Sequence, residues 1–288
     1  MNTLAIFGNH YQQGHLAGLR NFFANLAAKG FRVYVEHDFA HYLNSVGVDT
    51  DAFFVVEAFP RGVECVVSIG GDGTFLQAAQ WVGRRETPIL GINTGHLGFL
   101  ASYSLDDTDE LLDVMADGRG RIERRAVIEV VSDAMPDGFW PYALNEVAVL
   151  KGDSASMVTV HAEIDGYFLA DYMSDGLVVS TPTGSTAYNL SLGGPILQPT
   201  LSCLVLSPIA PHSLTMRPLV VSGGSCIVLT PKSRVRECRV SLDGRSFMVS
   251  SGESLMLKEA PFKVCVVRRP NGNFSALLRN KLGWATRP

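Results

Sequence analysis

The amino-acid sequence predicts an α/β domain followed by an all-β domain. The first third of the chain alternates short apolar runs with stretches of helical period. The remainder is a series of short apolar runs separated by turns that contain glycine. The chain has 288 residues, and about 150 residues per domain is usual, so the length also suits two domains. With 47% hydrophobic and 18% charged residues, the chain has enough apolar material for two buried cores.

The α/β domain is predicted over residues 1–120. Apolar runs predict strands at 4–7, 31–35, 63–69 and 88–92. Helical periodicity predicts a helix at 15–29, stopped by Gly30, and a second one that runs from the 70–74 segment through Trp81. The acidic residues at 106–110 are expected in the first turn of a further helix, where they favour the dipole. Strands joined by helices pair in parallel through right-handed crossovers, so we expect a doubly wound, Rossmann-like parallel sheet.

The all-β domain is predicted over residues 121–269. Turns such as Asp-Gly and Gly-Gly separate its predicted strands, with no helical stretch between them. The strands are expected at 126–131, 146–150, 158–164, 176–180, 204–206, 227–229, 239–242, 246–249, 254–257 and 263–267. A last segment, 274–284, has helical period. We expect this C-terminal helix, within residues 270–288, to return to the first domain.

Composition limits the location and the partners of the protein. The net charge of −4 argues against general binding to nucleic acid or to anionic membranes, which require a clustered basic surplus. Apolar runs are shorter than the roughly 18–20 residues of a membrane-spanning helix, and the first residues lack the pattern of a signal peptide. The five cysteines are widely spaced, without a CxxC pair, which indicates reduced thiols. We therefore expect a cytoplasmic protein that binds neither nucleic acid nor membranes.

The strongest local motif is GGDGT at residues 70–74, directly after the predicted strand 63–69. Open α/β sheets bind ligands beyond the carboxyl ends of their strands, and glycines before a helix N-terminus can cradle phosphates. A carboxylate in such a cradle is unexpected, because it would repel phosphates. Its presence is explained if Asp72 binds Mg²⁺ or takes a proton from an attacking hydroxyl. The alternative is a plain Asp-Gly turn. A second glycine-rich turn, 91–100, follows the next strand, and we expect both turns on one edge of the sheet.

Polar residues also gather at two places in the all-β domain. Asn145 and Glu146 enter an apolar strand, and the segment 174–188 combines hydroxyls, glycines and Tyr188. Part of this pattern is turn chemistry, but short hydrogen-bonding groups beside a flat ring also suit a base and a ribose. Other nucleotide motifs do not match: the chain has no Gly-Lys dipeptide for a P-loop and no GxGxxG after the first strand.

Taken together, these motifs resemble the NAD kinase family, which transfers a phosphoryl group to the 2′-hydroxyl of the adenosine ribose of NAD. GGDGT alone also occurs in diacylglycerol kinases and, loosely, in phosphofructokinases, whereas its combination with TPTGSTAY is far more specific. The motifs that carry the resemblance follow in family order: GGDGT at 70–74, GINTGHLGFL at 91–100, Asn145-Glu146, Asp175-Gly176 with TPTGSTAY at 181–188, Gly193-Gly194-Pro195 and Pro211-His212-Ser213-Leu214.

The resemblance implies a role for each matching residue. Asp72 would be the catalytic general base, and Mg²⁺ or another divalent cation would accompany ATP. The ATP phosphates would contact Gly70, Gly71, Gly73 and Thr74. The NAD-binding residues implied are Asp72, Gly73, Asn145, Glu146, Asp175, Thr183, Thr186, Ala187, Tyr188, Asn189, Leu190, Ser191 and Ala210. Family members usually assemble through the β domain, so the resemblance also implies a homodimer or homotetramer.

Two positions depart from the family pattern. Met173 stands where many members carry a basic residue, and Arg245 follows Asp243-Gly244 where Gln is common. Both departures bear on acceptor preference and on contacts between subunits.

Two other functions compete with this interpretation. A different GGDGT-type kinase would act on a lipid or on a sugar phosphate. A lipid kinase needs an apolar or basic membrane-docking segment, which the sequence does not show. A sugar-phosphate kinase needs arginines near the second glycine turn, and there is no arginine between Arg85 and Arg119. A non-catalytic dinucleotide-binding sensor would be expected to lose the acid of the glycine turn, but Asp72 is present. The sequence therefore predicts an NAD kinase; the resemblance implies ATP as the phosphoryl donor, with polyphosphate as the alternative.

Overall fold

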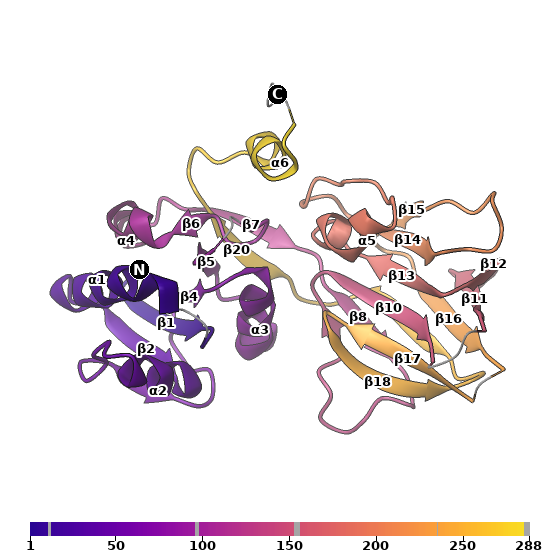
Figure 1. The fold of residues 1–288 in the computed structure, drawn as a ribbon, viewed down its shortest axis with the longest axis horizontal. Helices are drawn as coiled ribbons and strands as arrows, with labels where there is room; N and C mark the ends of the chain where they lie inside the picture. The colour runs from indigo at the N-terminus through magenta and orange to yellow at the C-terminus, as the bar shows by residue number, and fades with distance from the viewer. Residues whose placement is uncertain (11–12, 96–97, 153–155, 235, 285–288) are drawn as a thin grey trace. The chain divides into compact units, whose positions relative to one another are not determined.

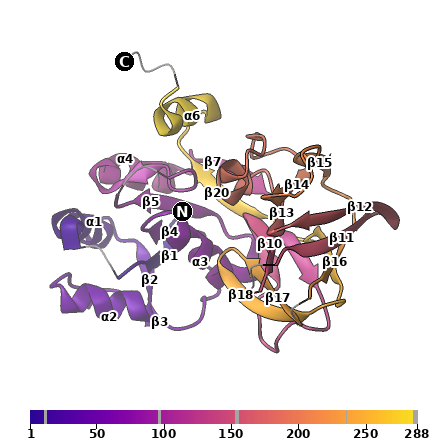
Figure 2. The ribbon, with the colours of Figure 1, turned by 45° about the vertical axis from the view of Figure 1, so that its right-hand side comes forward.

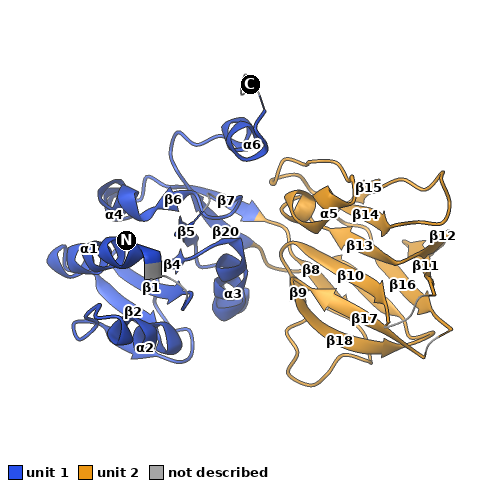
Figure 3. Cartoon of the chain, in the orientation of Figure 1, with its two compact units in different colours: residues 1–124, 264–288 blue, residues 125–263 orange. Residues whose placement is uncertain are grey.

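The computed structural model describes the whole chain except residues 11–12, 96–97, 153–155, 235 and 285–288 (Figure 1). Contacts divide the chain into two compact units, residues 1–124 with 264–288 and residues 125–263 (Figure 3). The expected boundaries were 120/121 and 269/270, so the first unit takes a few residues more at each junction. No helix in the described part of the chain is long and apolar enough to cross a membrane.

The first unit is built on one eight-stranded sheet. Its order is β3-β2-β1-β4-β5-β20-β7, with β6 also paired to β5. The four predicted strands are present, and the pairings from β3 to β20 are parallel, which confirms the predicted fold class. The strands are β1 Thr3–Gly8, β2 Arg32–Glu36, β3 Phe54–Val56, β4 Cys65–Ile69, β5 Ile89–Asn93, β6 Tyr103–Ser104, β7 Arg121–Arg125 and β20 Val264–Arg268.

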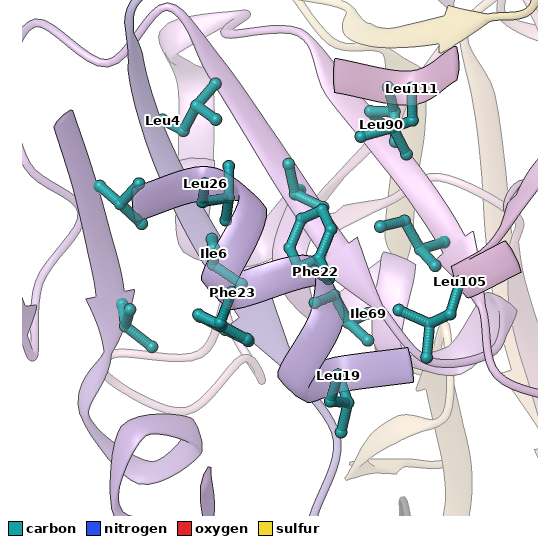
Figure 4. Packing of buried hydrophobic residues seen from close by; sticks show 14 of the residues in the cluster. Leu4, Ile6, Leu19, Phe22, Phe23, Leu26, Ile69, Leu90, Leu105 and Leu111 are labelled. Carbon is teal, nitrogen blue, oxygen red and sulfur yellow. The ribbon is translucent and has the colours of Figure 1, made fainter. Parts of the chain in front are cut away.

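Helices cover both faces of this sheet. Helix α1 places its apolar residues at positions i, i+3, i+4 and i+7, and these pack with residues of β1 and β4 in one buried core (Figure 4). Helix α3 also contacts β1, β4 and β5. Its buried residues do not belong to the core that α1 shares with these strands. Because neighbouring residues of a strand point to opposite faces of the sheet, α3 packs on the other face. The helices are α1 Leu16–Ala28, α2 His37–Ser45, α3 Asp72–Val82, α4 Thr108–Asp117 and α6 Phe274–Leu282, with short 3-10 turns η1 Gln13–His15, η2 Gly83–Arg85 and η3 Leu105–Asp107.

One strand lies in a different unit from the one expected. The run 263–267 was predicted to belong to the all-β domain, but β20 pairs in parallel with β5, with Val266 opposite Ile89. Its residues are buried on both faces, as in a central parallel strand, and such an apolar run carries no information about its pairing partner. The residues of strand β7 were also expected in the all-β domain. The strand lies instead in the sheet of the first unit, as the neighbour of β20.

The second unit is a sandwich of two six-stranded antiparallel sheets (Figures 1 and 2). Their orders are β15-β14-β13-β10-β17-β18 and β12-β11-β16-β19-β8-β9, and inward-facing residues of both sheets share one core. The elements are β8 Ile128–Val131, β9 Tyr142–Ala143, β10 Glu146–Lys151, β11 Val158–Ile164, β12 Tyr167–Ser174, β13 Gly176–Ser180, η4 Gly184–Thr186, α5 Tyr188–Ser191, β14 Cys203–Ile209, β15 Leu219–Ser222, β16 Ile227–Lys232, β17 Glu237–Leu242, β18 Arg245–Ser250 and β19 Leu255–Glu259.

Candidate active site

The GGDGT segment lies where the strand order of the parallel sheet reverses. From β1 the sheet continues through β2 on one side and through β4 on the other. The Asn9 N–H after β1 donates to the Ile69 carbonyl at 3.1 Å, and the Gly70 N–H after β4 donates to Ile92 at 2.9 Å. Open sheets of this kind bind ligands at the carboxyl ends of their strands, at the reversal.

Asp72, the first residue of α3, is held by the second glycine turn. Its carboxylate accepts backbone N–H bonds from Phe99 at 2.8 Å, Leu100 at 3.0 Å and Ala101 at 3.4 Å. A Cβ atom on Gly98 would overlap the same carboxylate, so only glycine fits there. The two turns therefore share one edge of the sheet, as predicted; residues 96–97 of the second turn lie outside the described residues. A carboxylate has about four acceptor positions, so the three bonds from the described residues leave one position of Asp72 for a ligand.

Arg268, at the end of β20, fixes the other side of this turn. Its guanidinium donates to the carbonyls of Phe99 at 2.7 Å and Leu100 at 3.3 Å, and to Glu123 at 3.3 Å. Burial lowers the pKa of Arg268, against the charges of Glu123 and Asp72, which raise it. Sequence reasoning missed this residue. An arginine that directly follows a buried apolar run was the only available signal.

The glycines of the GGDGT turn serve different purposes. A Cβ on Gly70 would overlap the buried Thr74 side chain, so packing within the protein requires glycine there. Cβ atoms added at Gly71 and Gly73 would meet no atom of the described residues within 4 Å. These two positions therefore leave open space beside the free N–H groups at the start of α3, the arrangement that binds anions.

In the second unit, Asn145 and Glu146 lie against the TPTGSTAY turn. The Thr181 hydroxyl donates to the Leu144 carbonyl at 2.6 Å, and the Thr181 N–H donates to Asn145 at 2.9 Å. A Cβ on Gly184 would overlap the Asn145 carbonyl. The structure thus brings together the two motifs that were predicted to hold NAD.

The hairpin turn between β17 and β18 holds the same segment from the other side. The Asp243 carboxylate accepts N–H bonds from Leu144 at 2.6 Å, Asn145 at 2.9 Å and Glu146 at 3.1 Å. Burial raises the pKa of Asp243. Burial and the charge of Asp243 raise the pKa of Glu146 to about 7, against an N–H bond from Tyr188 that lowers it. Glu146 Oε2 is buried and has no hydrogen-bond partner among the described residues.

Residues of the TPTGSTAY turn and α5 differ in how they could meet a ligand. Tyr188 is 38% exposed and Ser191 is also exposed, whereas Thr186, Ala187 and Leu190 are half-buried. Thr183 is buried, and its hydroxyl accepts a bond from Arg125 at 3.2 Å. Asn189 is fully buried; its amide donates to the Ser185 and Pro195 carbonyls and accepts from Ser207 at 2.7 Å. The Asn189 side chain is therefore engaged with the protein itself.

Two predicted NAD-binding residues lie at the opposite end of β13. Asp175 precedes this strand; its N–H donates to Ile209 at 2.9 Å, next to Ala210, and its carboxylate pairs with Lys151 at 2.7 Å. Ala210 has a φ of 43°, unusual for a residue with a side chain. At about 3.3 Å per residue, the length of β13 separates Asp175 from the TPTGSTAY turn by roughly 20 Å. The structure therefore divides the predicted NAD-binding residues of this unit into two groups.

The two departures from the family pattern have different surroundings. The Met173 side chain is 50% exposed on β12. Arg245 donates to the carbonyls of Trp140 at 2.8 Å and Tyr142 at 2.6 Å, and burial lowers its pKa. Arg245 thus fastens the loop before β9 to the hairpin that carries Asp243.

Comparisons with known proteins agree with both units. Residues 4–119 match the family model of the ATP-NAD kinase N-terminal domain, and residues 144–268 match that of the ATP-NAD kinase C-terminal domain. Proteins named NAD kinase from Bacteroides fragilis and Porphyromonas gingivalis are each 40% identical to this chain. The matches cover 97% and 99% of this chain, and 97% and 98% of those proteins.

Solved structures extend the comparison. A yeast NADH kinase complexed with NADH has a TM-score of 0.87 at 23% identity, covers 100% of this chain and 89% of its own, and shows the likeness of fold. An NAD kinase from Archaeoglobus fulgidus in complex with ATP has a TM-score of 0.74 at 28% identity, over 96% of this chain and 98% of its own. The resemblance drawn from the sequence motifs is confirmed. The chain belongs to the NAD kinase family, the enzymes that phosphorylate NAD with ATP.

Proposed function

We propose that this chain transfers the γ-phosphoryl group of ATP to the 2′-hydroxyl of the adenosine ribose of NAD, giving NADP. The observation that carries the proposal is the space that the described residues leave open at Gly71 and Gly73, beside the anchored carboxylate of Asp72. Phosphoryl transfer depends mainly on positioning and charge neutralisation. A phosphate cradle with an acid beside it suits the transfer of a phosphoryl group to a hydroxyl.

Asp72 acts in this scheme as the general base. Backbone bonds from the second glycine turn hold its carboxylate in one orientation, so its remaining acceptor position points to one place. A substrate hydroxyl there would give up its proton to Asp72 as the phosphorus–oxygen bond forms and the bond to ADP breaks. A positioned base contributes about 10²- to 10⁴-fold to such a step.

The ATP phosphates would lie at Gly70, Gly71, Gly73 and Thr74, with Mg²⁺ or another divalent cation bound to them. The described residues contain no cluster of three His, Cys, Asp or Glu side chains able to hold a metal ion. Mg²⁺ usually keeps several waters and binds through substrate phosphates in such sites, and the remaining acceptor position of Asp72 is assigned to the substrate hydroxyl, so the cation would be held by the ATP phosphates and water. The residues present therefore fit a cation shared with ATP, which would neutralise phosphate charge.

NAD would be held by the second unit through Asn145, Glu146 and the TPTGSTAY turn. The buried Glu146 Oε2, without a partner in the described chain, suits a hydrogen bond with the substrate. Tyr188 offers an exposed ring for stacking. Asp175 and Ala210, at the far end of β13, would contact a different part of the ligand.

We also propose that copies of the chain assemble through the all-β unit into a homodimer or homotetramer. Strands β12 and β15 are edge strands with exposed apolar side chains: Tyr167 is 79% exposed, Phe168 62% and Val220 45%. Exposed apolar side chains on sheet edges suit burial against another chain. Light-scattering mass measurement tests this; a monomer at micromolar concentration would contradict it.

A cytoplasmic location is part of the same proposal. It is supported by five cysteines that are all free thiols, since disulfides are rare in reducing compartments. Cell fractionation with an antibody against the chain tests the location.

The direct test of the activity is incubation of the purified chain with Mg-ATP and NAD, followed by an assay specific for NADP. We expect NADP to form in proportion to enzyme and time. Binding of NAD without turnover would instead favour the non-catalytic sensor.

A further inference from the structure

The turn between β17 and β18, to which the sequence assigned no role in binding, contacts the segment predicted to hold NAD. Asp243 has a φ of 47° and precedes Gly244, with a φ of 85°. Its N–H donates to the Glu146 carbonyl at 3.2 Å, while its carboxylate accepts from Leu144, Asn145 and Glu146. One side chain thus fixes three consecutive amides at the residues expected to bind NAD.

This contact completes a clamp on a short piece of backbone. Thr181, directly after β13, binds the carbonyls of Leu144 and Asn145. Asp243, in the hairpin turn, binds the amides. The backbone at the start of β10 is therefore hydrogen-bonded on both sides, by the residue that follows β13 and by the turn that follows β17. The outcome is that Glu146 Oε2 remains buried without a protein partner in the described chain, an arrangement that costs free energy unless a ligand satisfies the atom.

We propose that Asp243 is a positioning residue for NAD: its carboxylate holds the backbone of residues 144–146 so that the Asn145 and Glu146 side chains meet the substrate. The proposal rests on the proposed function, because it takes NAD as the ligand of these two residues. Asp243 itself touches no substrate atom in this scheme. It acts through the geometry of the segment it anchors.

The chain contains a second turn of the same construction, which serves as a matched control. Asp165, between β11 and β12, has a φ of 53° and precedes Gly166, with a φ of 80°. Its N–H donates to the Cys226 carbonyl at 2.9 Å, and its carboxylate accepts the Cys226 N–H at 2.8 Å. Asp165 is exposed and binds one amide rather than three. The two turns share their chemistry but differ in what they anchor.

The test compares Asp243→Asn with Asp165→Asn. The amide keeps the size of the side chain but replaces one acceptor oxygen by an NH₂ group, which cannot accept the backbone N–H bonds. We expect Asp243→Asn to raise the KM for NAD by roughly 10- to 100-fold, as misplacement of binding groups by about an ångström does. The KM for ATP should change less than about 2-fold, and Asp165→Asn should leave both constants within the same limit.

Calorimetric titration of NAD in the absence of ATP provides a second readout that does not depend on activity. A double-mutant cycle with Glu146→Gln adds a third: the effects of the two substitutions should not add, because Asp243 acts through this segment. Thermal unfolding and circular dichroism check that each variant folds. If Asp243→Asn does not fold, Asp243→Ser carries the same test, because its short hydroxyl removes the carboxylate without placing an NH₂ group against the backbone N–H groups.

The outcomes separate this proposal from the proposed function. If the unaltered chain forms no NADP, the proposed function fails, while NAD titration still tests Asp243. If a folded Asp243 variant binds NAD like the unaltered chain, loses NAD and ATP affinity equally, or behaves like Asp165→Asn, the positioning role is overturned. A KM effect selective for NAD and non-additive with Glu146→Gln supports it.

Discussion

Replacing Gly73 by alanine is expected to separate stability from activity. Gly73 lies in the first turn of α3, and an added Cβ would meet no atom within 4 Å in the described part of the chain. Glycine inside a helix costs about 0.5–1 kcal/mol relative to alanine, so the variant should unfold at the same temperature or slightly higher, by about 2–4 °C per kcal/mol for a unit of this size. The new methyl group fills the space proposed for phosphate. We therefore expect the KM for ATP to rise at least about 10-fold, which corresponds to about 1.4 kcal/mol.

Gly98→Ala is the contrasting change at the same carboxylate. Its Cβ would overlap Asp72, so the variant must displace the acid or the turn that binds it. Overpacking costs about 1–3 kcal/mol, and each lost hydrogen bond to a charged group about 1.5–3 kcal/mol. Both the unfolding temperature and kcat should fall. Gly224→Ala, an exposed position with ordinary φ and no close contact, should change neither.

Thermal unfolding of the three variants is measured beside NADP formation at varied ATP, coupled to an NADP-dependent dehydrogenase. The reasoning about the glycine turn is refuted if Gly73→Ala is as stable as expected and also has an unchanged KM for ATP. An unfolding temperature for Gly98→Ala equal to that of the unaltered chain would refute the assignment of Gly98 to packing against Asp72.

Three further predictions concern the acids and the acceptor hydroxyl. Asp72→Asn should lower kcat by 10²-fold or more while NAD binding persists; a loss below about 10-fold, measured by steady-state kinetics, contradicts a general base. An NAD analogue with a 2′-deoxy adenosine ribose should bind, with a loss of about 1–3 kcal/mol, and should yield no phosphorylated product by mass spectrometry. Burial raises the pKa of Glu146 to about 7, above the unfolded value near 4.5, so its contribution to stability is present below pH 4.5 and is lost as the pH rises through 7, by roughly 3 kcal/mol at most. Glu146→Gln should flatten this decline in thermal unfolding between pH 5 and 8; an unchanged decline would contradict it.

Local pattern predicted much of the fold because the parallel strands are short, mostly apolar runs. The helix predicted at 15–29 corresponds to α1, and the helix predicted from the 70–74 segment through Trp81 corresponds to α3. Strand β12 was missed because its residues are mostly exposed or half-buried, which leaves no alternating apolar pattern. The placement of β20 could not be predicted, since pairing partners are set by tertiary contacts rather than by the run itself.

The candidate site was predictable only where motifs mark it. Asp72, Asn145 and Glu146 were found from short motifs that resemble those of a known family. Asp243 and Arg268 were not, because each acts on backbone atoms far away in the sequence: 97–99 residues for Asp243, 168–169 for Arg268. Such contacts leave no local signal. Only the folded chain shows which segment they hold.

The position of the transferred phosphate tests the central claim most directly. The purified chain is incubated with Mg-ATP and NAD, and the product is analysed by phosphorus NMR and by an NADP-specific dehydrogenase. The account predicts a single product that carries its new phosphate on the 2′-hydroxyl of the adenosine ribose, and none with Asp72→Asn. A phosphate on another hydroxyl, or full product formation by Asp72→Asn, would contradict it.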